Sequence, residues 1–171
     1  MIAFIISLVA FLAFNVAIFS RYGMPTSVSE SCFLMPERYG RHVFFAFCIL
    51  TALPLLIFWL DVYTGPLQFL AFLSCAGLMF VGAAAEFKQI GLTRNVHFGG
   101  AAVCAICSQL WIAFTSHWWI ASIVLFIAAG ILSRRFKGVD ADGQARSAWL
   151  YFFEMAAFLS IYIALFAYFF K

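Results

Sequence analysis

Apolar residues occur along the chain in six long runs, each bounded by charged or turn-forming residues. A helix that crosses the hydrocarbon core of a bilayer needs about 20 mostly apolar residues, and each run is close to this length. The pattern therefore predicts an all-α membrane protein of six transmembrane helices that forms a single domain over residues 1–171. The runs cover residues 1–20, 42–60, 66–86, 97–114, 118–134 and 147–170.

The composition supports this fold class. Of the 171 residues, 66% are apolar, 20% aromatic and only 10% charged. Soluble domains average about 45–50% apolar and about 25% charged residues. Six spans of about 20 residues would leave about 51 residues for all termini and loops. The composition excludes a soluble enzyme domain and a nucleic-acid-binding protein, so we expect membrane lipids around the chain and no nucleic-acid partner.

The basic residues predict an orientation. Of the 10 lysines and arginines, all but Lys171 fall in the connections that follow the first, third and fifth runs. Short loops rich in Lys and Arg stay in the cytoplasm. We therefore expect both termini on the outer side of the membrane, which we take to be the inner (plasma) membrane of a bacterium. The residues in these connections are Arg21, Arg38, Arg41, Lys88, Arg94, Arg134, Arg135, Lys137 and Arg146.

The tryptophans fall near the ends of the apolar runs, where membrane proteins concentrate aromatic side chains at the two interfaces with water. Their positions predict an interfacial belt that agrees with the proposed orientation. Four lie at predicted outer ends and one at a predicted inner end. These are Trp59, Trp111, Trp118 and Trp119 on the outer side and Trp149 on the inner side.

The longest connection, residues 21–41, is predicted to lie in the cytoplasm. Ser27 and Glu30 have the spacing of a capping box, in which each side chain accepts a backbone N–H of the other residue. This spacing predicts a short interfacial helix over Val28–Leu34. Its apolar part, Cys32–Met35, would insert beneath the lipid head groups.

One carboxylate lies well inside a predicted span. Glu154 is about seven residues into the last run, or about 10 Å below its inner end. A carboxylate at the centre of a membrane helix costs about 2.5 to 3.5 kcal/mol, so Glu154 must face protein or water. Ser147 and Tyr151 share its face at helical spacing and would form a polar stripe from the inner surface.

The predicted topology permits a polar cluster at the cytoplasmic side. His42, Glu86 and His97 lie at inner helix ends, and Glu154 reaches inward from the same side. Residues Ser27–Glu30 would cover this cluster. The candidate ligand-binding residues are Glu154, His97, Glu86, His42, Ser27, Glu30 and Tyr151.

Simpler structural roles remain open for these residues. Helix-end histidines and carboxylates can be satisfied by lipid head groups. Glu86 can pair with Lys88 or Arg94, and Ser27 and Glu30 can act only as a helix cap. Glu154 can bind a ligand or form a buried structural pair with another residue.

Other residue patterns predict structure and no cofactor or metal. The five cysteines lie in spans or in the reduced cytosol, so we expect free packing residues. Residues 138–143 carry Asp140 and Asp142 but lack the spacing of a calcium loop, which predicts a solvated turn. Small residues favour a close approach of the third and fourth spans. These are Gly77, Gly82, Gly99 and Gly100, with neighbouring alanines and serines.

Two short motifs carry a family resemblance. They are Ser27-Val28-Ser29-Glu30 after the first run and Val96-His97-Phe98-Gly99-Gly100 at the start of the fourth. With the six-run layout, they resemble small six-helix families of the DRAM and FRAG type and related uncharacterised bacterial membrane proteins. The resemblance implies six spans and a functional polar pocket at one face, and names no substrate. The chain differs from seven-helix ceramidase-like zinc hydrolases because it lacks a His-x-x-x-His pair.

Three functions follow as hypotheses. The favoured one is an integral membrane protein without enzymatic activity, which binds or transports a small or lipidic ligand through a cytoplasm-facing pocket centred on Glu154 and His97. The second is a membrane-embedded enzyme acting on lipid head groups, with these two residues as general acid and base or as metal ligands. The third is an assembly or regulatory subunit within a homo-oligomer or a larger membrane complex.

Overall fold

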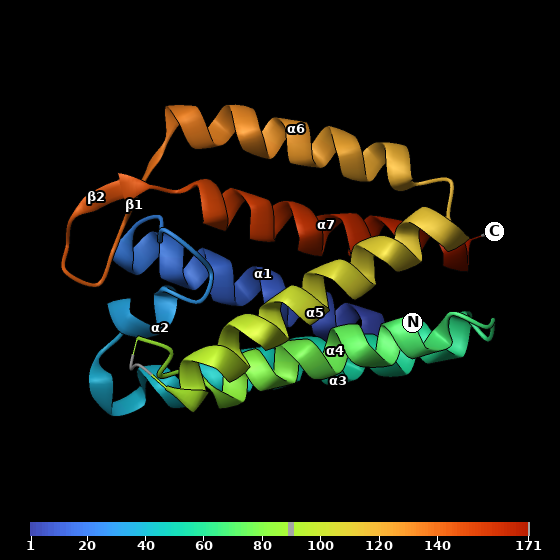
Figure 1. Cartoon of the computed structure of the whole chain (residues 1–171), viewed down its shortest axis with the longest axis horizontal. Helices are drawn as coiled ribbons and strands as arrows, with labels where there is room; N and C mark the ends of the chain where they lie inside the picture. Colours follow the sequence, from blue (N-terminus) through green and yellow to red (C-terminus); the bar gives the residue numbers. More distant parts are fainter. Residues whose placement is uncertain (89–90, 171) are drawn as a thin grey trace.

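A computed structural model describes residues 1–88 and 91–170. In this part of the chain six long helices form a bundle, and each runs antiparallel to the long helix before it in the sequence (Figure 1). Each predicted run forms one helix, and the all-α class is confirmed. Both chain termini lie at one end, which we call the termini end (Figure 1). The long helices are α1 (Ile2–Tyr22), α3 (Glu37–Val62), α4 (Gln68–Ala83), α5 (Leu92–Thr115), α6 (Trp119–Arg135) and α7 (Trp149–Phe169).

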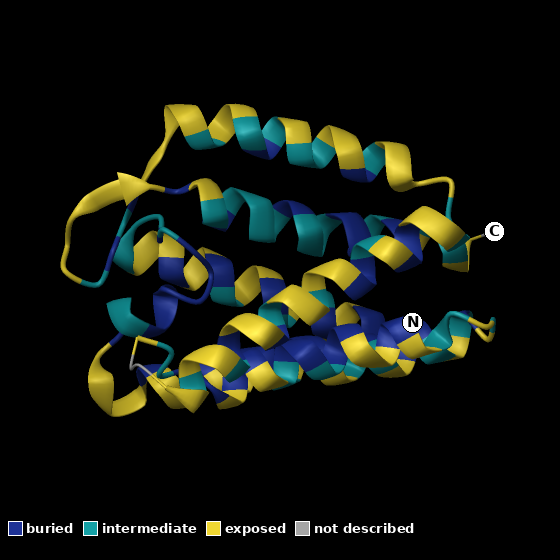
Figure 2. Ribbon diagram, viewed as in Figure 1, coloured by how far each residue is buried: buried dark blue, intermediate teal, exposed yellow. Residues whose placement is uncertain are grey.

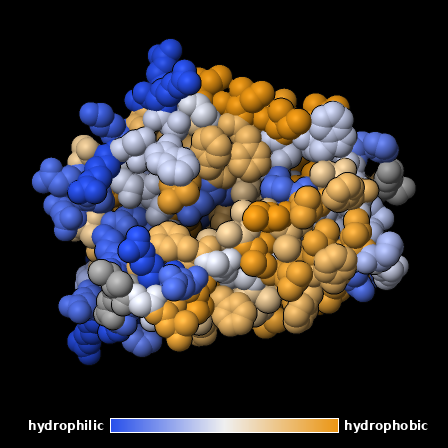
Figure 3. Space-filling model, viewed as in Figure 1, coloured by the Kyte–Doolittle hydropathy of each residue, from blue (hydrophilic) through white to orange (hydrophobic). Residues whose placement is uncertain are grey.

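Four of these helices, α1, α3, α5 and α7, are long and apolar enough to cross a membrane. Their lengths run from 21 to 26 residues, whereas α4 has 16 residues and α6 has 17. Many large apolar residues of the long helices are exposed. Figure 2 shows exposed residues in stripes along these helices. Figure 3 shows hydrophobic surface over the helices and hydrophilic surface gathered at the end opposite the termini.

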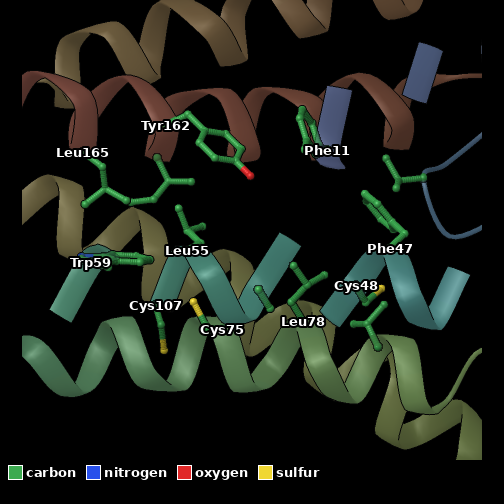
Figure 4. Close-up of a cluster of buried hydrophobic side chains, with 14 of the residues drawn as sticks. Phe11, Phe47, Cys48, Leu55, Trp59, Cys75, Leu78, Cys107, Tyr162 and Leu165 are labelled. Atoms are coloured by element: carbon green, nitrogen blue, oxygen red, sulfur yellow. The ribbon is translucent and has the colours of Figure 1, made fainter. Parts of the chain in front are cut away.

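The interior of the bundle is filled mainly by aromatic and aliphatic side chains from α1, α3, α4, α5 and α7 (Figure 4). The Phe11 and Tyr162 rings pack in a tilted arrangement, with their centroids 5.6 Å apart. The Trp59 and Trp111 rings meet edge to face at 5.0 Å, and the two side chains are 1% and 0% exposed. The predicted interfacial belt is therefore wrong for these two residues, because their positions around the helix turn them towards the neighbouring helices.

Helices α4 and α5 approach each other at two glycines, as the sequence predicts. A Cβ atom on Gly77 would lie 2.6 Å from the carbonyl oxygen of Gly100, and one on Gly100 would lie 2.7 Å from the carbonyl oxygen of Gly77. The Ser74 hydroxyl donates to the Cys104 carbonyl oxygen at 3.0 Å beside this contact. Gly82 instead packs on Cys48 of α3, and Gly99 faces open space. Of the four glycines, only Gly77 and Gly100 lie at the contact between α4 and α5.

The end opposite the termini is covered by a layer that we call the cap, formed by residues 23–36 and 136–148. The first segment contains α2 (Ser31–Leu34), which is shorter than the predicted helix because residues 28–30 form a turn. Cys32 and Met35 are buried in the protein, so the predicted insertion beneath lipid head groups is wrong for them. Burial raises the pKa of the Cys32 thiol to about 11, and all five cysteines are free, as predicted.

The second cap segment is a β-hairpin, although a solvated turn is predicted there. Strands β1 (Lys137–Val139) and β2 (Ala145–Ser147) pair antiparallel. The Val139 N–H donates to the Met24 carbonyl oxygen at 2.7 Å, which ties the hairpin to the first cap segment. Asp140 is only 5% exposed. Ser147 belongs to β2 and α7 begins at Trp149, so Ser147 is not part of the predicted helical stripe.

Replacing Gly100 by Ala tests the α4–α5 contact. The new methyl group would meet backbone atoms that cannot rotate away, so we expect a loss of about 1–3 kcal/mol in the free energy of unfolding. The neighbouring Gly99→Ala variant is the matched control, because nothing lies within 4 Å of its Cβ position. Thermal unfolding in detergent measures both. Equal stability of the two variants would contradict the close contact.

Candidate ligand-binding site

A pocket of about 410 Å³ lies under the cap, between the first turns of α5 and α7. We call it the mouth pocket. One wall comes from the first cap segment, another from the hairpin, and the floor from the two helices. Its polar lining includes Thr26, Ser27, Ser29, Glu30, Lys88, His97, Asp140, Asp142, Arg146, Ser147 and Glu154.

Glu154 lies in the second turn of α7 at the floor of this pocket. Its Oε2 atom accepts the Val28 N–H at 2.5 Å, so the carboxylate faces the cap loop. Among residues 1–88 and 91–170, no other hydrogen bond or ion pair reaches this carboxylate. One oxygen is thus committed to the backbone and the carboxylate has no cationic partner in this part of the chain.

Glu154 also borders a second cavity, of about 90 Å³, which extends between α3, α4, α5 and α7. We call it the inner cavity. Its lining is almost entirely apolar and includes Leu55, Trp59, Cys75 and Leu78, which Figure 4 shows pointing into the bundle interior. Its volume is several times the ~10–15 Å³ that one water requires. Glu154 therefore lies at the boundary between a polar pocket and an apolar cavity.

His97 lies in the second turn of α5 and is 2% exposed. Its Nδ1 atom is 3.1 Å from the Val81 carbonyl oxygen and 3.0 Å from the Ala84 carbonyl oxygen. These carbonyls belong to the end of α4, where the last turn of a helix has no intrahelical partners. Since carbonyl oxygens only accept, Nδ1 carries the proton.

The other ring nitrogen of His97 faces the cap. Its Nε2 atom is 3.1 Å from the Ser29 Oγ atom. With the proton on Nδ1, Nε2 of the neutral ring accepts a hydrogen bond from the Ser29 hydroxyl. The Phe87 ring stacks on the imidazole at a centroid distance of 4.1 Å. One imidazole thus joins α4, α5 and the cap loop.

Glu30 holds three segments of the cap region together. Its Oε1 atom accepts Lys88 Nζ at 2.6 Å and the Ala141 N–H of the hairpin at 3.0 Å. The Glu30 N–H donates to Ser27 Oγ at 2.9 Å, which is one half of the predicted capping box. The other half would be a hydrogen bond from the Ser27 N–H to the Glu30 carboxylate. Among the described residues this carboxylate instead accepts from Lys88 and Ala141.

Asp140 organises the hairpin turn. Its Oδ1 atom accepts the Gln144 N–H at 2.8 Å and the Asp142 N–H at 3.0 Å, and Arg146 Nε lies 2.6 Å from Oδ2. The Gln144 N–H bond and the Arg146 charge hold the pKa of Asp140 below its usual value, against an opposing effect of burial. The hairpin is therefore stabilised by the ionised carboxylate.

The charges around the mouth pocket do not balance. Glu30 pairs with Lys88 and Asp140 pairs with Arg146. These two pairs use both cations in the lining and leave Glu154 and Asp142 without a basic partner among the described residues. The pocket therefore favours a positively charged group. In the same part of the chain, no three His, Cys, Asp or Glu side chains are placed to hold a metal ion.

The structure does not form the four-residue cluster that the predicted topology permits. His97 and Glu154 both line the mouth pocket, but His42 is exposed on α3 and lines neither cavity. Glu86 pairs with Arg41 in a separate pocket on the other side of the cap. These corrections have one cause: residues at the same depth on different helices meet only where their helical faces point at one another.

The other candidate residues have defined places. Ser27 and Glu30 line the mouth pocket. Tyr151 does not line it and holds the cap loop instead: its N–H donates to the Thr26 carbonyl oxygen at 3.1 Å, and its hydroxyl donates to Asn15 Oδ1 at 3.4 Å.

Sequence reasoning missed Ser29 as a site residue, and it missed the hairpin. Ser29 falls within a serine-rich motif, but only the fold brings His97 to it. The hairpin has a readable signal in the dipeptide Asp142-Gly143, which favours a tight turn between two strands. Gly143 has φ 73°, the backbone conformation that glycine adopts readily.

Comparisons with protein-family models, curated proteins and solved structures find no match to this chain. The resemblance to DRAM- and FRAG-type families therefore stays a prediction. The function is argued below from the two cavities and the residues that line them.

The pKa of Asp140 gives a test of the hairpin. Because folding lowers this pKa, the stabilisation is fully present above the usual aspartate value of 3.8 and is lost as the pH falls through the lowered value. We expect the Asp140 carboxyl carbon to titrate by NMR with a midpoint below 3.8, and Arg146→Gln to raise that midpoint. Arg135→Gln, outside the hairpin, is the control. A midpoint unaffected by Arg146→Gln would contradict the ion pair.

Proposed function

We propose that this chain is an integral membrane protein with six spans and both termini on the non-cytoplasmic side. The four membrane-length helices support the membrane assignment. The antiparallel order of the six long helices and the common position of the two termini support an even number of spans (Figure 1). The concentration of basic residues around the cap supports a cytoplasmic cap.

Cysteine labelling in intact cells tests this orientation. Thr64 lies in the α3–α4 connection at the termini end, and Gln144 lies in the hairpin; both are exposed. We expect a membrane-impermeant maleimide to label Thr64→Cys in intact cells and Gln144→Cys only after permeabilisation. The unmodified chain, with its five native cysteines, gives the background. Labelling of Gln144→Cys alone in intact cells would reverse the orientation.

We further propose that the protein binds or transports an amphiphile whose polar end is cationic. The observation that carries this proposal is the position of Glu154, which lines both cavities and has no cationic partner among the described residues. A cationic group at Glu154 would neutralise the carboxylate, and the first few methylene groups of an attached apolar chain would enter the inner cavity. Burial of these groups would add hydrophobic binding energy.

The shape of the molecule supports access for such a ligand. Both cavities are lined by residues of α5 and α7, including Ala101 from α5 and Glu154 from α7. Figure 3 shows the surface hollowed between these helices, with hydrophilic atoms in the depression and hydrophobic surface around it. A ligand dissolved in the surrounding lipid can therefore approach with its polar end towards Glu154.

Glu154→Gln tests the ligand proposal with dodecylammonium as the probe. Glutamine retains an oxygen that can accept the Val28 N–H, so the variant removes the charge and keeps the loop contact. We expect the affinity for dodecylammonium to fall at least about tenfold, which corresponds to about 1.4 kcal/mol. Native mass spectrometry of protein in nanodiscs counts the bound probe.

Glu86→Gln is the matched control, since it removes a carboxylate outside both cavities. Dodecyl sulfate tests the sign of the charge preference and is expected to bind more weakly than dodecylammonium. Equal affinity of the unmodified protein and Glu154→Gln would overturn the proposal that Glu154 binds the cationic end.

A further inference from the structure

The Ser29 hydroxyl and the His97 imidazole form a pair that has the geometry of a nucleophile and its base. The Oγ–Nε2 distance is 3.1 Å, within the ≈ 2.6–3.2 Å expected for such pairs. In the neutral ring, Nε2 is the unprotonated nitrogen and faces the hydroxyl. Ser29 is therefore placed to lose its proton to His97 as its oxygen attacks a substrate.

The imidazole is held in this orientation by a third group, as catalytic bases usually are. The Val81 and Ala84 carbonyl oxygens both face Nδ1, so the proton stays on that nitrogen and Nε2 stays free to accept. The same two carbonyls would stabilise the positive charge that appears on the ring when Nε2 takes a proton. Phe87 covers one face of the ring and fixes its plane.

The position of Ser29 determines which bond of a ligand it can reach. Like Glu154, Ser29 lines both the mouth pocket and the inner cavity, so its hydroxyl lies near the boundary between polar and apolar space. In an acyl amphiphile, the ester group joins the polar end to the apolar chain. A ligand with its polar end in the mouth pocket and the first few methylene groups of its chain in the inner cavity would place that ester beside Ser29.

We propose that this chain hydrolyses the carboxylic ester of an amphiphile, with Ser29 as the nucleophile and His97 as the general base. This inference rests on the proposed binding of an amphiphile across the two cavities. It assigns to the same site a reaction and a substrate class.

The reaction proceeds in two steps that use water as the second reactant. In the first, Ser29 Oγ forms a bond to the ester carbonyl carbon, its proton passes to His97 Nε2, and the carbon–oxygen bond to the alcohol breaks. The leaving alkoxide takes the proton from Nε2. In the second, His97 takes a proton from water, the hydroxide oxygen bonds to the acyl carbon, and Ser29 Oγ leaves with the proton. The products are a carboxylic acid and an alcohol.

A dodecyl fluorophosphonate tests the nucleophile directly. Its phosphorus bonds to an activated serine oxygen, fluoride leaves, and the adduct is located by peptide mass spectrometry. We expect the unmodified protein in nanodiscs to carry the adduct on Ser29. The labelling rate should fall at least about a hundredfold in His97→Gln, since removal of a general base costs about 10²–10⁴ in rate, and Ser29→Ala should carry no adduct.

The chain offers matched controls for both residues. Ser31→Ala removes the hydroxyl at the start of α2, which donates to the Val28 carbonyl oxygen. Ser31 is not among the residues that line the two cavities. His42→Gln removes an exposed imidazole outside the site. Both variants should retain labelling at Ser29. Hydrolysis of a p-nitrophenyl dodecanoate should follow the same order among the variants.

Dodecylammonium binding, measured on the same samples, separates the two proposals. Binding without an adduct on Ser29 of the unmodified protein would overturn the hydrolase inference and leave the ligand-binding proposal intact. An adduct on Ser29 without dodecylammonium binding would support the nucleophile and overturn the cationic-ligand proposal. Absence of both in folded protein would overturn both. The decisive sample is the unmodified protein, so loss of folding in a variant does not affect the conclusion.

Discussion

The last turn of α4 leaves carbonyl oxygens that need a donor, and His97 supplies one. In a helix that ends inside a protein, such groups cost about 1–3 kcal/mol each when left unsatisfied. The imidazole N–H lies within hydrogen-bond distance of two of these carbonyls, so the ring orientation follows from α4 and the opposite nitrogen is directed at Ser29. The geometry of the candidate site therefore depends on how α4 ends.

The glycine contact between α4 and α5 has a second consequence for the site. Gly77 and Gly100 allow the two backbones to approach each other, and α5 then crosses the front of the bundle obliquely towards α7 (Figure 1). Both cavities are lined by residues of α5 and α7, and the inner cavity is also lined by residues of α3 and α4. The contact that joins α4 to α5 thus helps to position one wall of both cavities.

The cap closes this space with paired charges and backbone contacts. Glu30 links Lys88 to the hairpin, and Asp140 pairs with Arg146 within it. A Cβ atom on Gly138 would lie 2.6 Å from the Pro25 carbonyl oxygen, so the hairpin packs directly on the first cap segment. These pairs neutralise the two cations of the lining. The carboxylates of Glu154 and Asp142 are left as the charges that a ligand would meet.

The six long helices are predictable from the amino-acid sequence, since runs of about 20 apolar residues and their boundaries follow from local composition and periodicity. The sequence also identified Glu154 from its depth and placed His97 and the Ser27–Glu30 segment at one end. Tertiary structure decided which of these residues meet. His42 and Glu86 share that end with His97, yet one is exposed and the other pairs with Arg41.

The same distinction explains the tryptophans and Ser29. The depth of a residue in the bundle follows from its distance along the helix, which can be counted in the sequence. The partner of its side chain depends on how the neighbouring helices are rotated about their axes. Trp59 and Trp111 lie at helix ends but turn inward against each other, and Ser29 meets His97 across 68 positions of sequence. Contacts between distant residues arise only when the helices pack, so the pairing at the centre of the proposed site came from the fold alone.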